Sequence, residues 1–454
     1  MTKENKIHIQ IPKDVAFILR LLEQEGYEAY AVGGCVRDSL LGRQPKDWDI
    51  TTSALPEQVK AIFHRTIDTG IQHGTVTVMM HHTGYEVTTY RIDGEYKDGR
   101  HPKKVEFTSK LIEDLKRRDF TINAMAYNPK TGLVDIFDGI GDLNRKVIRC
   151  VGKAQERFSE DALRILRAVR FAAQLGFHIE EKTREGLSEL AENLTYISKE
   201  RIQVELDKLL CSDNPGHMRI LYETGVSKVI LPQWDAMMET PQNHPYHCYN
   251  VGEHTIKAME SVPPDHYLRW CMLLHDVGKP ICKTTDEQGI DHFYGHQKAG
   301  SEMAEEILRG LKWDNKTIDW VTRLVYWHDY QVEPRMKTVR RSIVKIGEDI
   351  YPYFLQVKLG DMMAQSDVNR QERQETLEQI GEMYEKIIEQ KHCLRLRDLA
   401  VNGRDLLAVG IPSGTCVGNI LNALMEWVLD NPQNNEKELL MEKVKELQKE
   451  LSKE

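Results

Sequence analysis

Long apolar runs, paired cysteines and an excess of positive charge are all missing from this sequence. No apolar run approaches the roughly 20 residues that cross a bilayer, and the polar start, MTKENKIHIQIPKD, lacks the apolar core of a signal peptide. The eight cysteines are scattered without a CxxC pair, which argues against zinc ribbons and redox motifs. We therefore expect a cytoplasmic protein with reduced thiols and no membrane partner.

The net charge of −9 excludes a protein that coats nucleic acid along its whole surface, but it allows a local basic groove. Basic side chains do gather in two short stretches of the chain. One stretch holds Lys103, Lys104, Lys110, Lys116, Arg117 and Arg118, and the other holds Arg164, Arg167 and Arg170.

With 454 residues the chain is too long for one ordinary core, so several domains are expected. An amphipathic helix at 14–25, closed by Gly26, precedes β-rich runs that continue to about residue 150, and helical patterns follow. The sequence thus predicts an α+β fold. Its predicted parts are a sheet-containing head over 1–150, a helical neck over 151–240, a third domain over 241–370 and a helical body and tail over 371–454. The segment PQNHPYHCYN, at 241–250, has the composition of a linker.

The stretch AVGGCVRDSLLGRQPKDWDITT combines a glycine turn with paired carboxylates. Gly33 and Gly34 lie between a predicted strand and a predicted helix, where backbone N–H groups can approach a phosphate, and Arg37 follows one turn later. Asp47 and Asp49 stand at i and i+2 in a strand-like stretch, so both carboxylates are expected on one face. Two Mg²⁺ ions held by such a pair can activate a 3′-hydroxyl and neutralise a nucleoside triphosphate.

GG-x-VRD followed by DxD resembles the signature of the polymerase-β-like nucleotidyltransferases, in particular the class II tRNA CCA-adding enzymes and bacterial poly(A) polymerases. The resemblance extends to about residue 210 and implies a head with a mixed sheet. The run RRDFTINAMA resembles the family's ribose- and triphosphate-binding motif. It implies that Arg118 contacts the nucleotide phosphates, with Gly34 and Arg37, and that Asp119 and Asn123 lie near the sugar.

Two further segments fit the same family. DIFDGIGDL at 135–143 resembles the hinge between head and neck, and SKER at 198–201 resembles a motif that buttresses the template helix described next. Glu86 alternates outward on a later predicted strand and is a candidate third carboxylate.

A predicted helix at 159–175, SEDALRILRAVRFAAQL, carries the hypothesis for nucleotide selection. Asp161 and Arg164 are three residues apart and are therefore expected side by side on its surface. A carboxylate beside a guanidinium matches the donor–acceptor order shared by cytosine and adenine, whereas guanine and uracil present the reverse order. The segment matches the family's EDxxR motif, which implies that Arg167 and Arg170 contact the base or phosphates from the same face.

Histidines and aspartates gather again around LLHDVGKP. This pattern resembles the HD phosphohydrolases, whose helical domains bind one or two divalent metals, and it makes 241–370 an HD domain. The resemblance assigns the core ligands to His254, His275, Asp276 and Asp361, and it adds His296 and His328 in two-metal members. Imidazole with carboxylate suits Mn²⁺, Ni²⁺, Fe²⁺ or Mg²⁺. A phosphohydrolase is implied, with 2′,3′-cyclic phosphates at damaged RNA ends as its candidate substrate.

The predicted function is addition of C, C and A to the 3′ end of tRNA, with CTP, ATP and Mg²⁺ and without a nucleic-acid template. The partner tRNA is expected to bind the helical body and tail. A poly(A) polymerase is one alternative, although those relatives usually carry proline where Ala162 stands. A CC-adding enzyme is another, although the loop at 90–107 that such enzymes shorten looks complete here. An HD phosphohydrolase with a merely RNA-binding head is the alternative of another class, disfavoured by the intact DxD, RRD and EDxxR.

Overall fold

The computed structural model describes residues 7–93 and 105–451. The chain divides into two compact units, one of Met1–Ala236 with Gly310–Trp313 and the other of Met237–Arg309 with Asp314–Glu454. The finer division into four domains stays a prediction. Most of the loop at 90–107, with Lys103 and Lys104, lies outside the described residues.

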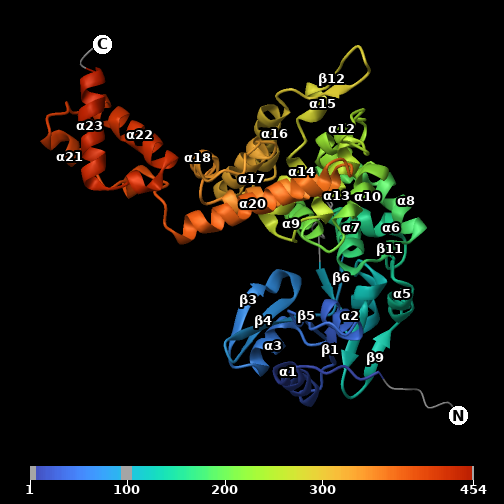
Figure 1. The fold of residues 1–454 in the computed structure, drawn as a ribbon. Helices are drawn as coiled ribbons and strands as arrows, with labels where there is room; N and C mark the ends of the chain where they lie inside the picture. Colours follow the sequence, from blue (N-terminus) through green and yellow to red (C-terminus); the bar gives the residue numbers. More distant parts are fainter. Residues whose placement is uncertain (1–6, 94–104, 452–454) are drawn as a thin grey trace. The chain divides into compact units, whose positions relative to one another are not determined.

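The first unit is built on a seven-stranded mixed sheet (Figure 1). Its order is β3-β4-β5-β2-β1-β8-β9, with β2 and β5 parallel and the other neighbours antiparallel. The strands of the head are β1 (Ala29–Val32), β2 (Ile50–Thr52), β3 (Thr66–Gly70), β4 (Thr75–Met80), β5 (Thr83–Thr89), the separate pair β6 (Arg91–Asp93) and β7 (Val105–Phe107), β8 (Met125–Asn128) and β9 (Gly132–Asp135). Its helices are α1 (Lys13–Gln24), α2 (Gly34–Leu40), α3 (Pro56–Ile62), α4 (Leu111–Lys116), the 3₁₀ turn η2 (Thr121–Asn123) and α5 (Gly139–Arg145).

The predicted α+β class is confirmed, and so are the first helix and the runs that form β1, β2, β4, β5 and β7. Helix α1 buries Val15, Ile18 and Leu22 along one stripe, and it ends before Gly26, whose φ of +88° only glycine adopts without strain. The strands β3, β8 and β9 were not predicted.

The neck begins with two helices where the sequence predicted one. Helix α6 ends at Glu160, and Asp161 is extended, with φ −142°. Its carboxylate accepts the N–H of Leu163 at 3.1 Å, so helix α7 starts there, and it also accepts Arg201 Nη2 at 2.9 Å. The continuous helix from 159 was therefore wrong, because these two bonds turn the chain at Asp161. The predicted end at Gly176, with φ +69°, is confirmed.

The elements of the neck are mostly short helices. They are α6 (Ala154–Glu160), α7 (Leu163–Leu175), the pair β10 (Val147–Ile148) and β11 (His178–Ile179), α8 (Glu181–Glu189), α9 (Lys199–Leu210), α10 (Met218–Glu223), α11 (Val226–Ile230) and α12 (Pro232–Met238). Helix α9 packs along α7 and brings Glu205 and Arg201 against it.

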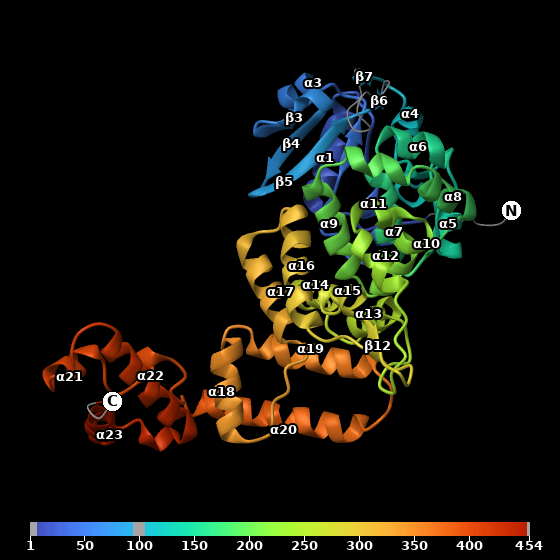
Figure 2. The same cartoon turned by 90° about the horizontal axis from the view of Figure 1, so that it is seen from above.

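The second unit is almost entirely helical, and α13, α14 and α19 pack against one another at its centre (Figure 2). Its elements are α13 (Val251–Glu260), α14 (His266–Leu274), α15 (Lys279–Cys282), the pair β12 (Thr284–Thr285) and β13 (Asp291–His292), α16 (His296–Gly310), α17 (Asn315–Trp327), α18 (Met336–Ile346), α19 (Tyr351–Ala364), α20 (Arg370–Glu389), α21 (Gly403–Ala408), α22 (Thr415–Asp430) and α23 (Lys437–Leu451). The prediction of a mostly helical chain after the head is thus confirmed. Across the described stretches, the helices lack the combination of length and apolarity that a bilayer span needs. All eight cysteines are unpaired.

Candidate functional site

Three carboxylates meet at one end of the central head strands. Asp47 and Asp49 lie just before β2 rather than within it, although the Asp49 carbonyl still accepts the N–H of Val32 at 3.0 Å. The parallel register that pairs Ile50 with Val87 sets Asp49 beside Glu86. Desolvation by the surrounding protein raises the pKa of Asp49. The charge of Arg118 acts to lower this pKa, and the charges of Glu86 and Asp47 raise it further.

These carboxylates fit divalent cations, since several acidic oxygens at one place favour a positive charge between them. The structure therefore brings the predicted pair together with the candidate third carboxylate, Glu86. The expectation that Asp47 and Asp49 sit in a strand was wrong, because the β2 ladder starts one residue after Asp49.

The glycine turn brings an arginine to the same end of the sheet. Gly33 has a φ of +80°, and a Cβ built on it would lie 3.0 Å from Arg118 Nη1. Gly34 then begins α2. The buried carboxylate of Asp114 holds Arg118 at 3.3 Å and Arg117 at 2.8 Å. Glycine is thus needed at position 33 for its conformation and for the close approach of a guanidinium.

A chain of buried polar contacts runs from α2 to α7. Arg37 Nη1 donates to Asn123 Oδ1 at 2.6 Å, and Asn123 Nδ2 donates to Asp119 Oδ1 at 3.1 Å. Arg167 closes the chain on Asp119 Oδ2 through Nε at 2.9 Å and Nη2 at 2.6 Å. Burial acts to raise the pKa of Asp119, but Arg167 and Asn123 hold that pKa well below its usual value.

Phe171 supports three guanidinium groups, a role that the sequence did not reveal. Arg37, Arg167 and Arg170 lie 4.9, 5.2 and 3.9 Å from its ring centroid. Arg170 is buried, with its Nε 2.5 Å from Glu205 Oε2. Arg37 and Arg170 therefore position their neighbours, whereas Arg167 remains one-third exposed.

The two predicted template residues have different partners here. Arg164 Nη1 donates to Glu160 Oε2 at 2.6 Å, and Nη2 donates to the carbonyl of Arg117 at 2.9 Å. Asp161 is held by Arg201, the arginine of SKER, as the predicted buttressing role requires. The two side chains were expected as neighbours on one helix, and this was wrong because Asp161 precedes α7. Both stay partly exposed.

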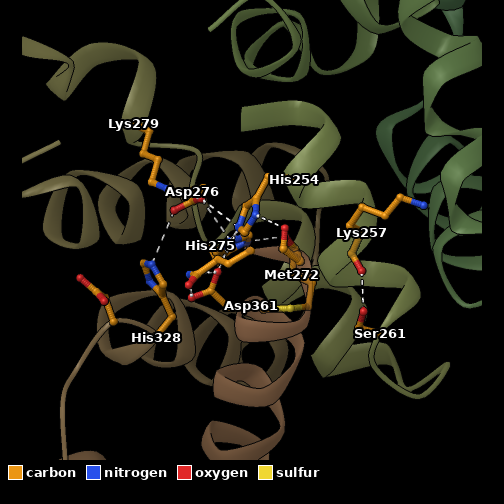
Figure 3. A network of polar contacts seen from close by, with 12 residues as sticks. His254, Lys257, Ser261, Met272, His275, Asp276, Lys279, His328 and Asp361 are labelled. Atoms are coloured by element: carbon orange, nitrogen blue, oxygen red, sulfur yellow. Dashed lines mark hydrogen bonds and ion pairs between the residues drawn. The ribbon is translucent and has the colours of Figure 1, made fainter. Parts of the chain in front are cut away.

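A second cluster lies in the other unit and consists of six side chains from five helices or their ends, and Figure 3 labels all of these side chains except His296. Two groups each place their ligand atoms within 4.8 Å of one another, His254 with His275 and Asp276, and Asp276 with His296 and His328. Asp361, on α19, adds Oδ1 at 3.0 Å from His254 Nε2. All six are buried, and the predicted ligand set is thus brought together with Asp276 at its centre.

Backbone carbonyls fix the tautomer of every histidine in this cluster. The Nδ1 atoms of the four rings donate to carbonyl oxygens, which can only accept. The pairs are His254 with Ala364 at 3.3 Å, His275 with Met272 at 2.7 Å, His296 with Phe293 at 2.7 Å and His328 with Val325 at 2.7 Å. Each neutral ring therefore turns an unprotonated Nε2 inward, as metal-binding histidines do.

These inward nitrogens face one another. His254 and His275 have their Nε2 atoms 3.2 Å apart, and those of His296 and His328 are 3.3 Å apart. Burial acts to raise the pKa of Asp276, but His275 and Lys279 hold it well below its usual value. Facing lone pairs beside an ionised carboxylate fit divalent cations, and the donor set suits the transition metals named above.

Comparison with known proteins agrees with the nucleotidyltransferase head and the helical remainder of the chain. Residues 29–149 match the poly A polymerase head domain, 176–238 a profile for the RNA and SrmB binding site of polymerase A, and 283–444 the second domain of tRNA nucleotidyltransferases. A CCA-adding enzyme of Lactiplantibacillus plantarum is 34% identical over 94% of each chain. One of Leuconostoc mesenteroides is 55% identical over 44% of this chain and 51% of that enzyme. The chain belongs to the CCA-adding enzymes.

Solved structures extend the likeness over the whole chain. The Bacillus stearothermophilus CCA-adding enzyme in complex with CTP has a TM-score of 0.68 at 31% identity, covering 97% of this chain and 100% of that one. The Thermotoga maritima enzyme complexed with tRNA has a TM-score of 0.62 at 22% identity, which shows a shared fold. The family confirms the predicted recognition and nucleotidyltransferase class, while the role of each site residue stays a prediction.

Sequence reasoning about this CCA-adding enzyme also missed two residues beside the His–Asp cluster. Lys279 Nζ lies 2.7 Å from Asp276 Oδ2, and its place three residues after Asp276 in HDVGKP was the available signal. His247 comes from the segment taken for a linker, and its ring meets that of His254 at 5.6 Å. Burial and nearby Lys279 lower the pKa of His247 to about 3.

The buried Asp119 predicts a pH-dependent contribution to stability. Replacing Asp119→Asn leaves Arg167 with only Glu205, whose Oε1 lies 3.9 Å from Arg167 Nη1, as a counter-charge, and this should cost roughly 2–4 kcal/mol at pH 7. Because the folded pKa lies below the unfolded value of about 3.9, this stabilisation exists above that value and disappears as pH falls through the folded pKa. Urea unfolding at pH 7 and pH 3.5 should show the difference between wild type and variant shrinking in acid. An equal difference at both pH values would contradict the ion pair.

Proposed function

We propose that this enzyme adds C, C and A in turn to the 3′ end of tRNA, from CTP and ATP, with Asp47 and Asp49 as its catalytic carboxylates. The observation that carries the assignment is the meeting of three carboxylates and Arg118 at the glycine turn. The family supports it, and the relatives are named for CCA addition rather than for poly(A) or CC addition. We expect the reaction in the cytoplasm, where tRNA and both nucleotides occur.

Different residues of the head would have different roles in nucleotide transfer. Mg²⁺ bound by Asp47 and Asp49 would lower the pKa of the tRNA 3′-hydroxyl and offset the triphosphate charge. Arg118, which forms an ion pair with Asp114, would bind the phosphates beside Gly33 and Gly34. The 3′-oxygen then joins the α-phosphorus, and pyrophosphate leaves.

Three side chains of the neck, spaced three residues apart, stay partly exposed, namely Asp161, Arg164 and Arg167. Asp161 and Arg164 would read the base, each steadied by a charged neighbour, Arg201 and Glu160 respectively. Arg167 and the Asp119–Asn123 pair lie next along the buried polar chain and would border the sugar and phosphates.

The His–Asp cluster favours a second function, a metal-dependent phosphohydrolase acting on 2′,3′-cyclic phosphates. Its support is the four histidines with inward Nε2 atoms around Asp276, beside a pocket of about 270 Å³ that Lys279 also lines. Divalent metals bound there would activate water and offset the charge of the phosphoester. Lys279, paired with Asp276, would bind a phosphate oxygen.

Removing either catalytic carboxylate should abolish nucleotide addition. Asp47→Ala or Asp49→Ala is expected to slow extension by about 10³-fold or more, because metal binding supplies several kcal/mol to the transition state. Extension of tRNA lacking CCA, with each nucleotide separately and all four together, measures this. Asp68→Ala, which removes an exposed ion pair on β3 of the same sheet, is the matched control. Near-normal rates in a folded Asp47/Asp49 double variant would refute the assignment.

Changing the template residues should relax nucleotide choice as well as slow addition. Asp161→Ala or Arg164→Ala removes half of the donor–acceptor pattern, which discriminates bases by about 1–3 kcal/mol. We expect incorporation of U or G to rise roughly tenfold relative to C, while Glu156→Ala, an exposed acid on α6, stays selective. Single-nucleotide extension with all four triphosphates measures the ratios. Strict selectivity in both template variants would place the template elsewhere.

The two sites should be separable by substitution. His275→Ala with Asp276→Ala should leave CCA addition near normal while abolishing hydrolysis of a 2′,3′-cyclic nucleotide and lowering the bound metal. Metal analysis and a cyclic-nucleotide assay with Mn²⁺, Ni²⁺, Fe²⁺ and Mg²⁺ check this. His296→Gln, which keeps the first group of ligands intact, serves as a milder variant if the double variant folds poorly. Unchanged metal content in both variants would disprove the site.

A further inference from the structure

A larger pocket adjoins the His–Asp cluster in the second unit. It encloses about 500 Å³, within the usual range for a small-molecule site, and lies between α19 and α20 and the 241–250 segment. Five residues line both this pocket and the smaller one at the metal ligands, namely His244, His247, Asp329, Asp361 and Gln365. The two pockets therefore meet at Asp361.

Hydrogen bonds tie the larger pocket to the metal ligands. Gln365 Nε2 donates to both oxygens of Asp361 at 3.0 Å, and Gln365 Oε1 accepts Arg373 Nη2 at 2.6 Å. A ligand that contacts Arg373 would thus be connected through Gln365 to the predicted metal ligand Asp361. This connection suits one substrate that spans both pockets.

Two cations in this pocket lack an anionic partner at ion-pair distance. Arg373 Nη1 is buried without a hydrogen bond, and in the part of the chain that the structure describes Lys358 forms no hydrogen bond or ion pair. Burial lowers the pKa of Lys358, Asp361 and Asp329 act to raise it from beyond ion-pair distance, and the charge of Arg373 adds to the lowering. Asp329, at the rim, already accepts Gln297 Nε2 at 2.9 Å. An anion between Lys358 and Arg373 would relieve both cations.

One side of the pocket is apolar. Leu355, Met362, Leu377 and Ile380 form a wall, and Tyr246 lies with its ring 5.9 Å from the Arg373 guanidinium carbon. A small inorganic anion would leave this wall uncovered. A nucleoside would cover it, with an anionic group at the end that reaches the two cations.

We propose that the second site acts on a nucleotide 2′,3′-cyclic phosphate that carries a further phosphate at its 5′ position. The cyclic phosphate would lie at the His–Asp cluster, the nucleoside against the apolar wall, and the 5′-phosphate between Lys358 and Arg373. This inference rests on the phosphohydrolase proposed above. Water adds to the cyclic phosphorus, one ring P–O bond breaks, and the departing oxygen takes a proton to become a hydroxyl.

The test compares adenosine 2′,3′-cyclic phosphate with its 5′-phosphorylated form, using the full chain and Mn²⁺. We expect kcat/KM to be at least about tenfold higher with the 5′-phosphate, as for one charge-assisted contact. Lys358→Met and Arg373→Met should each reduce this preference to about threefold or less. Lys358→Arg should retain the preference, and so should Lys386→Met, which removes an exposed lysine of α20.

Direct binding of both compounds, by calorimetry, gives a readout besides turnover. The 5′-phosphate should tighten binding in wild type and in Lys386→Met, and it should not in Lys358→Met. A trinucleotide ending in a cyclic phosphate tells whether the 5′-phosphate belongs to a free nucleotide or to an RNA end. Equal hydrolysis and equal binding of the two adenosine compounds would overturn the inference and leave the phosphohydrolase standing. Absence of hydrolysis with all four metals would overturn the phosphohydrolase, and the binding ratio would then still decide the pocket.

Discussion

The nucleotide site of the first unit depends on one line of buried polar contacts, Arg37–Asn123–Asp119–Arg167. It starts on α2, behind the glycine turn, passes through η2 and ends on α7 of the neck. A buried aspartate without partners would be very costly, so Asp119 holds the turn and the neck together through its ionised state. The Phe171 ring also connects α2 with α7, because the guanidinium groups of Arg37 on α2 and Arg167 on α7 lie over it.

Much of this site follows from the sequence, because its signals are local. A glycine pair between a strand and a helix, and acids two residues apart, point to phosphate and metal chemistry by spacing alone. The strands β4 and β5 follow from their β-branched residues. The break at Asp161 does not, since the apolar pattern continues through it and the bond that turns the chain comes from Arg201, forty residues later. Strands β8 and β9 are four residues each and are defined by their sheet neighbours.

In the second site, too, part of the arrangement could not be predicted from the sequence. The HD pair and the spaced histidines predicted the ligands, but the orientation of each ring depends on carbonyls that only folding supplies. His247 and Tyr246 lie in a stretch whose prolines, asparagines and histidines are typical of a linker. The stretch has no regular secondary structure, so no periodic pattern could place its side chains, yet it lines both pockets of the second unit.

The two sites solve a shared electrostatic problem with different residues. In the head, the carboxylates of Asp47, Asp49 and Glu86 belong to exposed residues, which suits hydrated Mg²⁺ that arrives with a nucleotide. In the second unit, imidazoles are buried and held in one tautomer, which suits a resident transition metal. A cation bound between the facing Nε2 atoms would also stabilise the folded unit, because a ligand that binds only the folded state favours folding. An acidic chain can thus handle anionic substrates by placing basic side chains beside its carboxylate clusters, as with Arg118 near Asp49 and Lys279 near Asp276.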